Sequence, residues 1–221
     1  MIEILYEDNH IIAVNKKASD IVQADKTGDK PLPEFVKDYI KKKYHKPGDV
    51  FLGVVHRLDR PVSGVIIFAK TSKSLIRLNE MFRQKKIQKT YWAMVKNRPI
   101  NKSETLVHYL LKNKEKNKSQ AYKKEGNKAL RSELIYKYIK SLDNYHLLEI
   151  KPKTGRHHQI RVQLSKIGCP IKGDIKYGFD RTNKDKSIHL HARKIEFIHP
   201  VKKESICIIA PTPNDVLWKA C

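Results

Sequence analysis

A single carboxylate between two guanidinium groups is the part of this sequence best suited to chemistry. Asp59 follows His56 and Arg57 and precedes Arg60, a few residues before the apolar run 65–69, which is typical of a buried strand. Loops held by rigid elements often carry catalytic groups. Two neighbouring positive charges favour the ionised carboxylate, so Asp59 is predicted to act as a nucleophile or a base. The alternative is an Arg–Asp cluster that only stabilises a turn.

A second polar cluster lies where a helix is predicted to begin. Ile160, Leu164 and Ile167 recur at helical spacing, and Gly168 is well placed to end the helix. The backbone N–H groups of a first helical turn favour a phosphate or a carboxylate. The polar side chains of this cluster are Arg156, His157, His158, Gln159 and Arg161.

A tyrosine on a predicted strand is the third candidate. Residues 90–95 alternate as a strand does, with Tyr91, Ala93 and Val95 on one face. A phenol in this place could stack on a base or move a proton. An ordinary half-buried strand tyrosine is the alternative.

The charge of the chain indicates an anionic partner. The 221 residues include 46 Lys and Arg against 23 Asp and Glu, which gives a net charge of +23. Such an excess favours binding to nucleic acid. We find no run of about 18 apolar residues that could span a membrane, so no membrane partner is expected. The alternative for part of the charge is a general richness in lysine, because lysines are spread over most of the chain.

The cysteines and the first residues predict an intracellular location. Cys169, Cys207 and Cys221 are widely separated and form no CxxC pair, which fits a reduced protein. The sequence from residue 1 lacks the basic start and apolar core of a signal peptide. A cytoplasmic protein is therefore expected.

The elements that position these residues follow from periodicity and turn signals. Helices are predicted from Pro33 through the lysines at 41–43, and after a cap at Thr71 or Ser72. Residues 112–128, the most polar stretch, are predicted to be a loop that could clamp a polyanion or simply be solvated. Strands are predicted over 3–6, 11–15, 65–69, 90–95 and 104–111, and a hairpin over 129–151.

Several separate motifs in one order give the chain a family resemblance. They are His56-Arg57-Leu58-Asp59 with Ser63-Gly64, then Gly155-Arg156, His158-Gln159-Ile160-Arg161, and Gly168-x-Pro170-Ile171-x-Gly173-Asp174. Together they resemble the RluA-type family of RNA pseudouridine synthases. The resemblance extends over nearly the whole chain, from about Leu5 to about His191-Ala192.

The resemblance implies an α+β fold, with a central mixed, mostly antiparallel sheet in two lobes, flanking helices and a catalytic cleft between the lobes. It implies a single catalytic domain over residues 1–221 without an S4 RNA-binding domain, acting on ribosomal or transfer RNA without metal or organic cofactor. A monomer is expected. Asp59 matches the catalytic aspartate, Tyr91 the tyrosine that lies against the target uracil, and Arg161 the basic residue that pairs with the aspartate. Arg57 matches an arginine that can fill the gap left by the extruded nucleotide. The further RNA-binding candidates are His56, Arg60, Arg156, His158 and Gln159.

The sequence departs from many relatives at three positions. They carry an acidic residue and Thr where Pro61 and Val62 stand, and Thr where His157 stands. The first two departures concern the geometry of the Asp59 loop.

Two other functions compete with this one. The first is an inactive RNA-binding or ribosome-assembly protein on the same scaffold, against which the intact set of Asp59, Tyr91 and Arg161 argues. The second is a metal-dependent nuclease, against which the lack of an accompanying acidic cluster argues. Its metal would be held by histidines among His56, His157, His158, His189 and His191.

Overall fold

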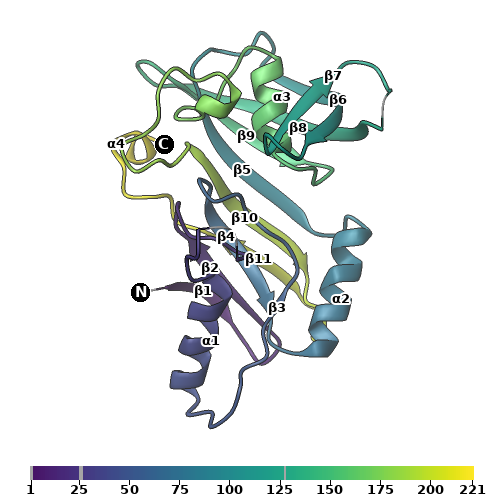
Figure 1. Ribbon diagram of the computed structural model, residues 1–221, viewed down its shortest axis with the longest axis vertical. Helices are drawn as coiled ribbons and strands as arrows, with labels where there is room; N and C mark the ends of the chain where they lie inside the picture. Colours follow the sequence, from purple (N-terminus) through teal and green to yellow (C-terminus); the bar gives the residue numbers. More distant parts are fainter. Residues whose placement is uncertain (1, 25–26, 127) are drawn as a thin grey trace. The chain divides into compact units, whose positions relative to one another are not determined.

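A computed structural model describes residues 2–24, 27–126 and 128–221 (Figure 1). The chain forms two compact units that each draw on two separate segments. The first unit consists of Met1–Gln88 and Ala192–Pro213, and the second of Lys89–His191 and Asn214–Cys221.

The first unit is built on a sheet that contains the apolar run next to Asp59. Its strands follow the order β1-β2-β4-β10, while β3 pairs with β4 and β11 with β10. All seven residues of β4 are buried, which explains its unbroken apolar sequence. The strands are β1 (Glu3–Glu7), β2 (Ile11–Lys16), β3 (Gly53–Val54), β4 (Ser63–Ala69), β10 (Leu190–Ile198) and β11 (Ser205–Ile209).

Both predicted helices of this unit are confirmed. Helix α1 spans Leu32–Lys43, with Pro33 in its first turn and three lysines in its last turn, where cations suit the helix dipole. Helix α2 spans Ser72–Arg83. Thr71 caps it, because its side chain accepts a hydrogen bond from the Ser74 backbone N–H at 3.2 Å.

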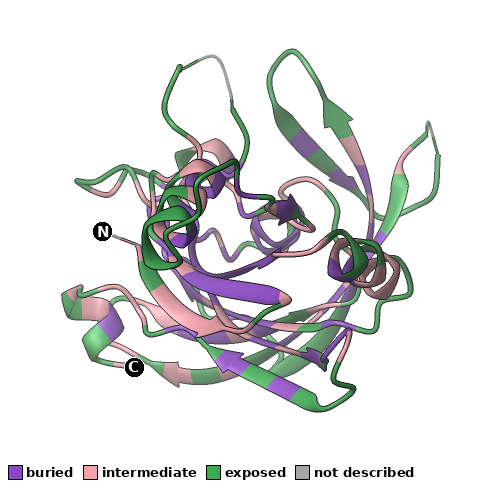
Figure 2. Cartoon of the chain, turned by 90° about the horizontal axis from the view of Figure 1, so that it is seen from below, coloured by how far each residue is buried: buried purple, intermediate pink, exposed green. Residues whose placement is uncertain are grey.

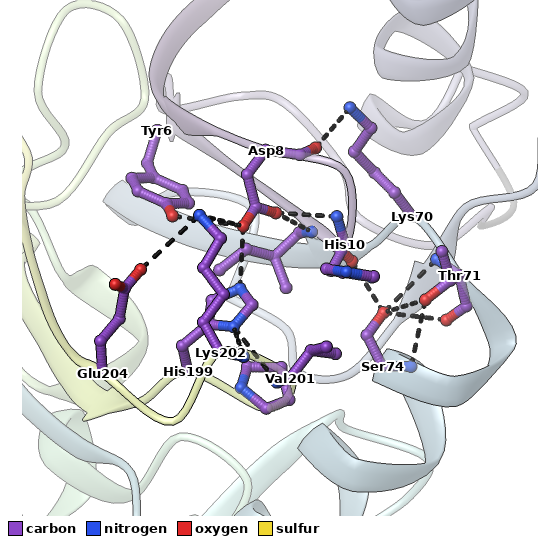
Figure 3. A network of polar contacts seen from close by, with 12 residues as sticks. Tyr6, Asp8, His10, Lys70, Thr71, Ser74, His199, Val201, Lys202 and Glu204 are labelled. Atoms are coloured by element: carbon purple, nitrogen blue, oxygen red, sulfur yellow. Dashed lines mark hydrogen bonds and ion pairs between the residues drawn. The ribbon is translucent and has the colours of Figure 1, made fainter.

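A network of polar contacts around Asp8 connects two turns of the first unit (Figure 3). In the β1–β2 turn, one carboxylate oxygen of Asp8 accepts the backbone N–H groups of His10 and Ile11, at 2.7 and 2.9 Å. The other oxygen lies 3.0 Å from Nε2 of His199 and 3.2 Å from Nζ of Lys202, beyond the end of β10. Burial raises the pKa of Asp8, but these hydrogen bonds and charges outweigh it and lower the pKa. The ionised Asp8 therefore holds the two turns together.

The second unit has an antiparallel sheet in the order β5-β9-β8-β6-β7. Buried and exposed residues alternate along much of β6, β7 and β8, as expected for a sheet with one face packed and one face in solvent (Figure 2). The strands are β5 (Gln88–Val95), β6 (Ser103–Asn113), β7 (Lys118–Tyr122), β8 (Leu130–Ser141) and β9 (His146–Pro152).

Helix α3 (Gln159–Lys166) begins within the second polar cluster, as predicted. Its Val162 packs in an apolar cluster with Leu110 of β6, Ala121 of β7 and Tyr177. Tyr177 ends the 3₁₀ helix η1 (Ile175–Tyr177). The short helix α4 (Val216–Lys219) packs Trp218 against Met94 and Leu147.

The predicted α+β fold with a mostly antiparallel sheet is confirmed, because every strand pair whose register is described is antiparallel. The predicted loop over 112–128 is partly wrong, since Lys118–Tyr122 forms β7 and pairs with β6. In the part of the chain that the structure describes, no helix is long and apolar enough to cross a membrane.

Candidate active site

Asp59 lies on the segment that joins β3 to β4 in the first unit. Its backbone carbonyl accepts the N–H of Val62 at 3.0 Å, which closes a turn. Leu58 and Val62, on either side, are buried, whereas Asp59 itself is half-buried. The apolar neighbours therefore anchor the loop, and the carboxylate stays accessible.

A buried lysine stabilises this loop through hydrogen bonds to its backbone. Lys16, the last residue of β2, is fully buried, and its ammonium group donates hydrogen bonds to three carbonyl oxygens. These belong to Lys17 at 3.0 Å, Arg60 at 3.1 Å and Val62 at 2.7 Å. Burial lowers the pKa of Lys16 to about 8, against the opposing charges of Asp20 and Asp59. Lys16 is not among the candidates that the sequence predicts.

The two arginines beside Asp59 have partners in the segment between β2 and α1. Nη1 of Arg57 donates to the side chain of Gln23. The guanidinium group of Arg60 pairs with Asp29 at 2.6 Å and donates to Thr27 at 3.1 Å. Both side chains are exposed. These arginines therefore tie the Asp59 loop to its neighbouring segment and present positive charge at its surface.

His56, predicted to bind RNA, contacts the interior of the first unit. Its Nε2 accepts the backbone N–H of Ile67 in β4 at 3.0 Å, and its ring stacks on Phe82 of α2 at 4.9 Å. Because Nε2 accepts this bond, the histidine joins the Asp59 loop to both β4 and α2.

Tyr91 and Arg161 belong to the second unit. Tyr91 is buried in β5, opposite Ile150 of β9. Arg161 is buried in α3 and makes two hydrogen bonds to Asp174, from Nε at 2.7 Å and from Nη2 at 2.8 Å. The sequence motif of residues 168–174 ends at Asp174 and predicts no role for this carboxylate.

The remaining polar residues near the start of α3 are largely engaged within the second unit. The side-chain oxygen of Gln159 accepts the Thr154 hydroxyl at 2.7 Å and the Arg156 N–H at 3.0 Å, and its nitrogen donates to the Glu133 carbonyl at 3.0 Å. His158 has a left-handed backbone, with φ of 52°, and its Nδ1 lies 2.8 Å from the Tyr177 hydroxyl. The Arg156 side chain is exposed. Gln159 thus shapes the turn, and Arg156 faces solvent.

The histidines proposed for a metal site have other contacts. Nδ1 of His189 lies 2.9 Å from Asn183, Nε2 lies 3.2 Å from Asp215, and the ring stacks on Trp218. His157 contacts Ser119 and Asn117 through its two ring nitrogens. Among the residues that the structure describes, no group of three or more His, Cys, Asp or Glu side chains is arranged to hold a metal ion.

Comparison with known proteins identifies the family. The family model for RNA pseudouridylate synthase matches residues 10–166. The chain belongs to the RNA pseudouridine synthases. These enzymes are isomerases, so the chain's activity is the conversion of uridine in RNA to pseudouridine.

Relatives in the family support this assignment. A "Ribosomal large subunit pseudouridine synthase C" from Buchnera aphidicola is 38% identical over 98% of this chain and 68% of the relative. A "tRNA pseudouridine synthase C" from Vibrio vulnificus is 32% identical over 99% of this chain and 93% of the relative.

A solved pseudouridine synthase structure shares the fold. "Human RNA Pseudouridylate Synthase Domain Containing 4" aligns with a TM-score of 0.81 and 23% sequence identity, over 98% of this chain and 90% of the human one.

Proposed function

We propose that this RNA pseudouridine synthase acts on a uridine in ribosomal or transfer RNA and uses Asp59 as its catalytic carboxylate. Tyr91 lies against the uracil, and Arg161 pairs with Asp59 in the working enzyme. The structure of the loop around Asp59 is the observation that supports its catalytic role. A half-buried aspartate is set on a turn that two hydrogen bonds from Lys16, to the carbonyls of Arg60 and Val62, and the packing of Leu58 hold in place. The names of the relatives support the two classes of RNA.

The reaction needs an ionised carboxylate next to the sugar. The bond from ribose C1′ to N1 of the uracil breaks, the base turns, and C1′ bonds to C5, whose proton leaves to solvent as N1 gains one. No atom is added overall and nothing is oxidised. The carboxylate either attacks C1′ covalently or removes a sugar proton.

Exposed arginines supply the RNA contacts in this proposal. A uridine stacked inside folded RNA must be flipped out, which costs roughly a few kcal/mol. Arg57 fills the resulting gap and Tyr91 stacks on the uracil, which offsets this cost. Arg60, Arg156 and the surface lysines contact phosphates, mostly without selecting a sequence.

Pseudouridine mapping tests the proposal directly. Ribosomal and transfer RNA are sequenced for pseudouridine from cells that lack the gene and carry the wild type, Asp59→Asn or Asp49→Asn. Asp49 is an exposed carboxylate outside the loop, so its variant is a matched control. We expect the wild type and Asp49→Asn to restore the same pseudouridine, and Asp59→Asn to restore none. Restoration by Asp59→Asn, or RNA that is identical with and without the gene, would refute the proposal.

A further inference from the structure

The guanidinium group of Arg161 is fixed along one edge by a buried carboxylate. Nε and Nη2 donate to the two oxygens of Asp174, at 2.7 and 2.8 Å, and the two side chains are 6% and 1% exposed. The backbone of Asp174 is held as well. Its N–H donates to the Ile171 carbonyl at 3.0 Å, and its carbonyl accepts the Tyr177 N–H at 3.0 Å. A rigid turn therefore carries the carboxylate that binds Arg161.

Tyr177 supports the guanidinium group from one face. Its ring centre lies 5.1 Å from the central carbon of the Arg161 guanidinium group, a distance typical of a cation–π contact. The Tyr177 hydroxyl accepts the backbone N–H of Ser119 at 2.8 Å and lies 2.8 Å from Nδ1 of His158. Because an amide N–H can only donate, the phenol's own proton is available to His158. Hydrogen bonds from β7 and from the start of α3 thus hold the ring.

We propose that Asp174 is a positioning residue for the isomerisation and that it acts through Arg161. A guanidinium group is planar and rigid, so fixing its Nε–Nη2 edge also sets the direction of its Nη1–Nη2 edge. In this proposal the second edge is the one that Arg161 uses in the reaction. The inference rests on the proposed function, in which Arg161 pairs with Asp59. Tyr177 holds the same plane, so Asp174 and Tyr177 together fix the orientation of the Arg161 guanidinium group.

A buried ion pair of this kind could instead serve stability only, and the rate with bound RNA separates the two roles. If Asp174 aims Arg161, its loss lets the guanidinium group move out of place. The rate with bound RNA then falls while the RNA affinity stays the same. A purely structural role would lower the melting temperature and leave the rate of the folded protein unchanged.

The experiment compares Asp174→Asn with Asp180→Asn in single-turnover assays on a uridine-containing substrate RNA. Asp180 is an exposed carboxylate that pairs with Lys96, which makes it a matched control. We expect Asp174→Asn to lower the rate constant about 100-fold, the cost of a small misplacement of a catalytic group. We expect its RNA affinity to be unchanged. Asp180→Asn should match the wild type. A folded Asp174→Asn protein with the wild-type rate overturns the inference.

Two further variants keep the test decisive. Asp174→Glu retains the negative charge but lengthens the side chain by one methylene, so it tests the aim even if Asp174→Asn does not fold. A slower rate in folded Asp174→Glu supports the inference, and an unchanged rate overturns it. Arg161→Ala separates a failure of the proposed role of Arg161 from a failure of the inference about Asp174. Wild-type activity of Arg161→Ala contradicts both the proposed role of Arg161 and the inference, whereas a slow Arg161→Ala with a fast Asp174→Asn contradicts the inference alone.

Discussion

A buried ammonium group beneath the Asp59 loop links the protonation of one lysine to the shape of the site. Lys16 can satisfy all three of its carbonyl partners only when it carries three N–H bonds. Burial lowers its pKa to about 8. The neutral amine that forms above this pH has only two N–H bonds, so one carbonyl loses its donor and the loop loosens.

We therefore predict that the single-turnover rate falls as the pH rises above about 8, by about tenfold per pH unit if only the protonated form is active. Stability should move the other way. The unfolded chain keeps the Lys16 proton up to about its ordinary pKa of 10.4, so this residue makes the folded state more stable as the pH rises between these values. Rate–pH profiles and urea unfolding over the same pH range measure both effects.

Lys16→Met and Lys17→Met form the matched pair for this prediction. Lys17 is the exposed neighbour of Lys16, so Lys17→Met should keep both the rate and its alkaline decline. Lys16→Met should be about 100-fold slower at pH 7, since a small misplacement of a catalytic group has an effect of this order, and its profile should lack the decline. An alkaline decline that persists in folded Lys16→Met would contradict this account.

The roles of single residues differ in how far the sequence predicts them. Asp59, Tyr91 and Arg161 stand in motifs, and their catalytic roles remain predictions. Lys16 gains its role from the carbonyls of residues 60 and 62, more than 40 positions away, which no local pattern reveals. His56 and Gln159 also stand in motifs and are predicted to bind RNA, yet both make hydrogen bonds within their units. The motifs that contain His56 and Gln159 therefore do not predict the contacts that the structure gives them.

At the scale of elements, β4 depends on a glycine at the point where the Asp59 loop joins the sheet. Gly64 has φ of +117°, a conformation that residues with a side chain rarely adopt. A Cβ atom there would lie less than 3.0 Å from the backbone nitrogen, carbonyl carbon and carbonyl oxygen of Ala192 in β10. The close approach of these two backbones therefore requires glycine.

We predict that Gly64→Ala destabilises the protein by about 3 kcal/mol, through overpacking and backbone strain. Gly48→Ala is the control, because a Cβ atom there meets nothing within 4 Å and its φ is not in the left-handed region. Urea unfolding measures the difference between the two variants. Equal stability of Gly64→Ala and Gly48→Ala would show that the contact with Ala192 is not a constraint.

Elements with a strong apolar pattern are predicted correctly. The polar strand β7 and the strands β10 and β11 near the C-terminus are not predicted. The helices beginning near Pro33 and after Thr71 are confirmed, as are the apolar strand 65–69 and the hairpin of β8 and β9. Strand β7 escapes prediction because its two buried residues are the small Ser119 and Ala121 among polar neighbours. Strand β10 mixes charged and apolar residues, and β11 has only five residues, so neither has a clear strand pattern.

At the scale of the whole molecule, charge governs the encounter with RNA. A net charge of +23 on 221 residues attracts a polyanion and releases its counterions on binding. We predict that RNA affinity falls about 100-fold between about 50 and 200 mM salt, as expected for about five phosphate contacts. Filter binding across this range measures the slope. An affinity that does not change with salt would mean that this charge takes no part in binding.

The central claim is that one carboxylate performs the isomerisation, and a single measurement tests it most directly. Wild-type and Asp59→Asn protein are mixed in excess with RNA tritiated at C5 of uridine, and tritium release is followed while filter binding reports the affinity. We predict that Asp59→Asn binds the RNA within about threefold of the wild type, because phosphate contacts supply most of the affinity, and releases no tritium above background. Tritium release by Asp59→Asn at the wild-type rate would contradict the account.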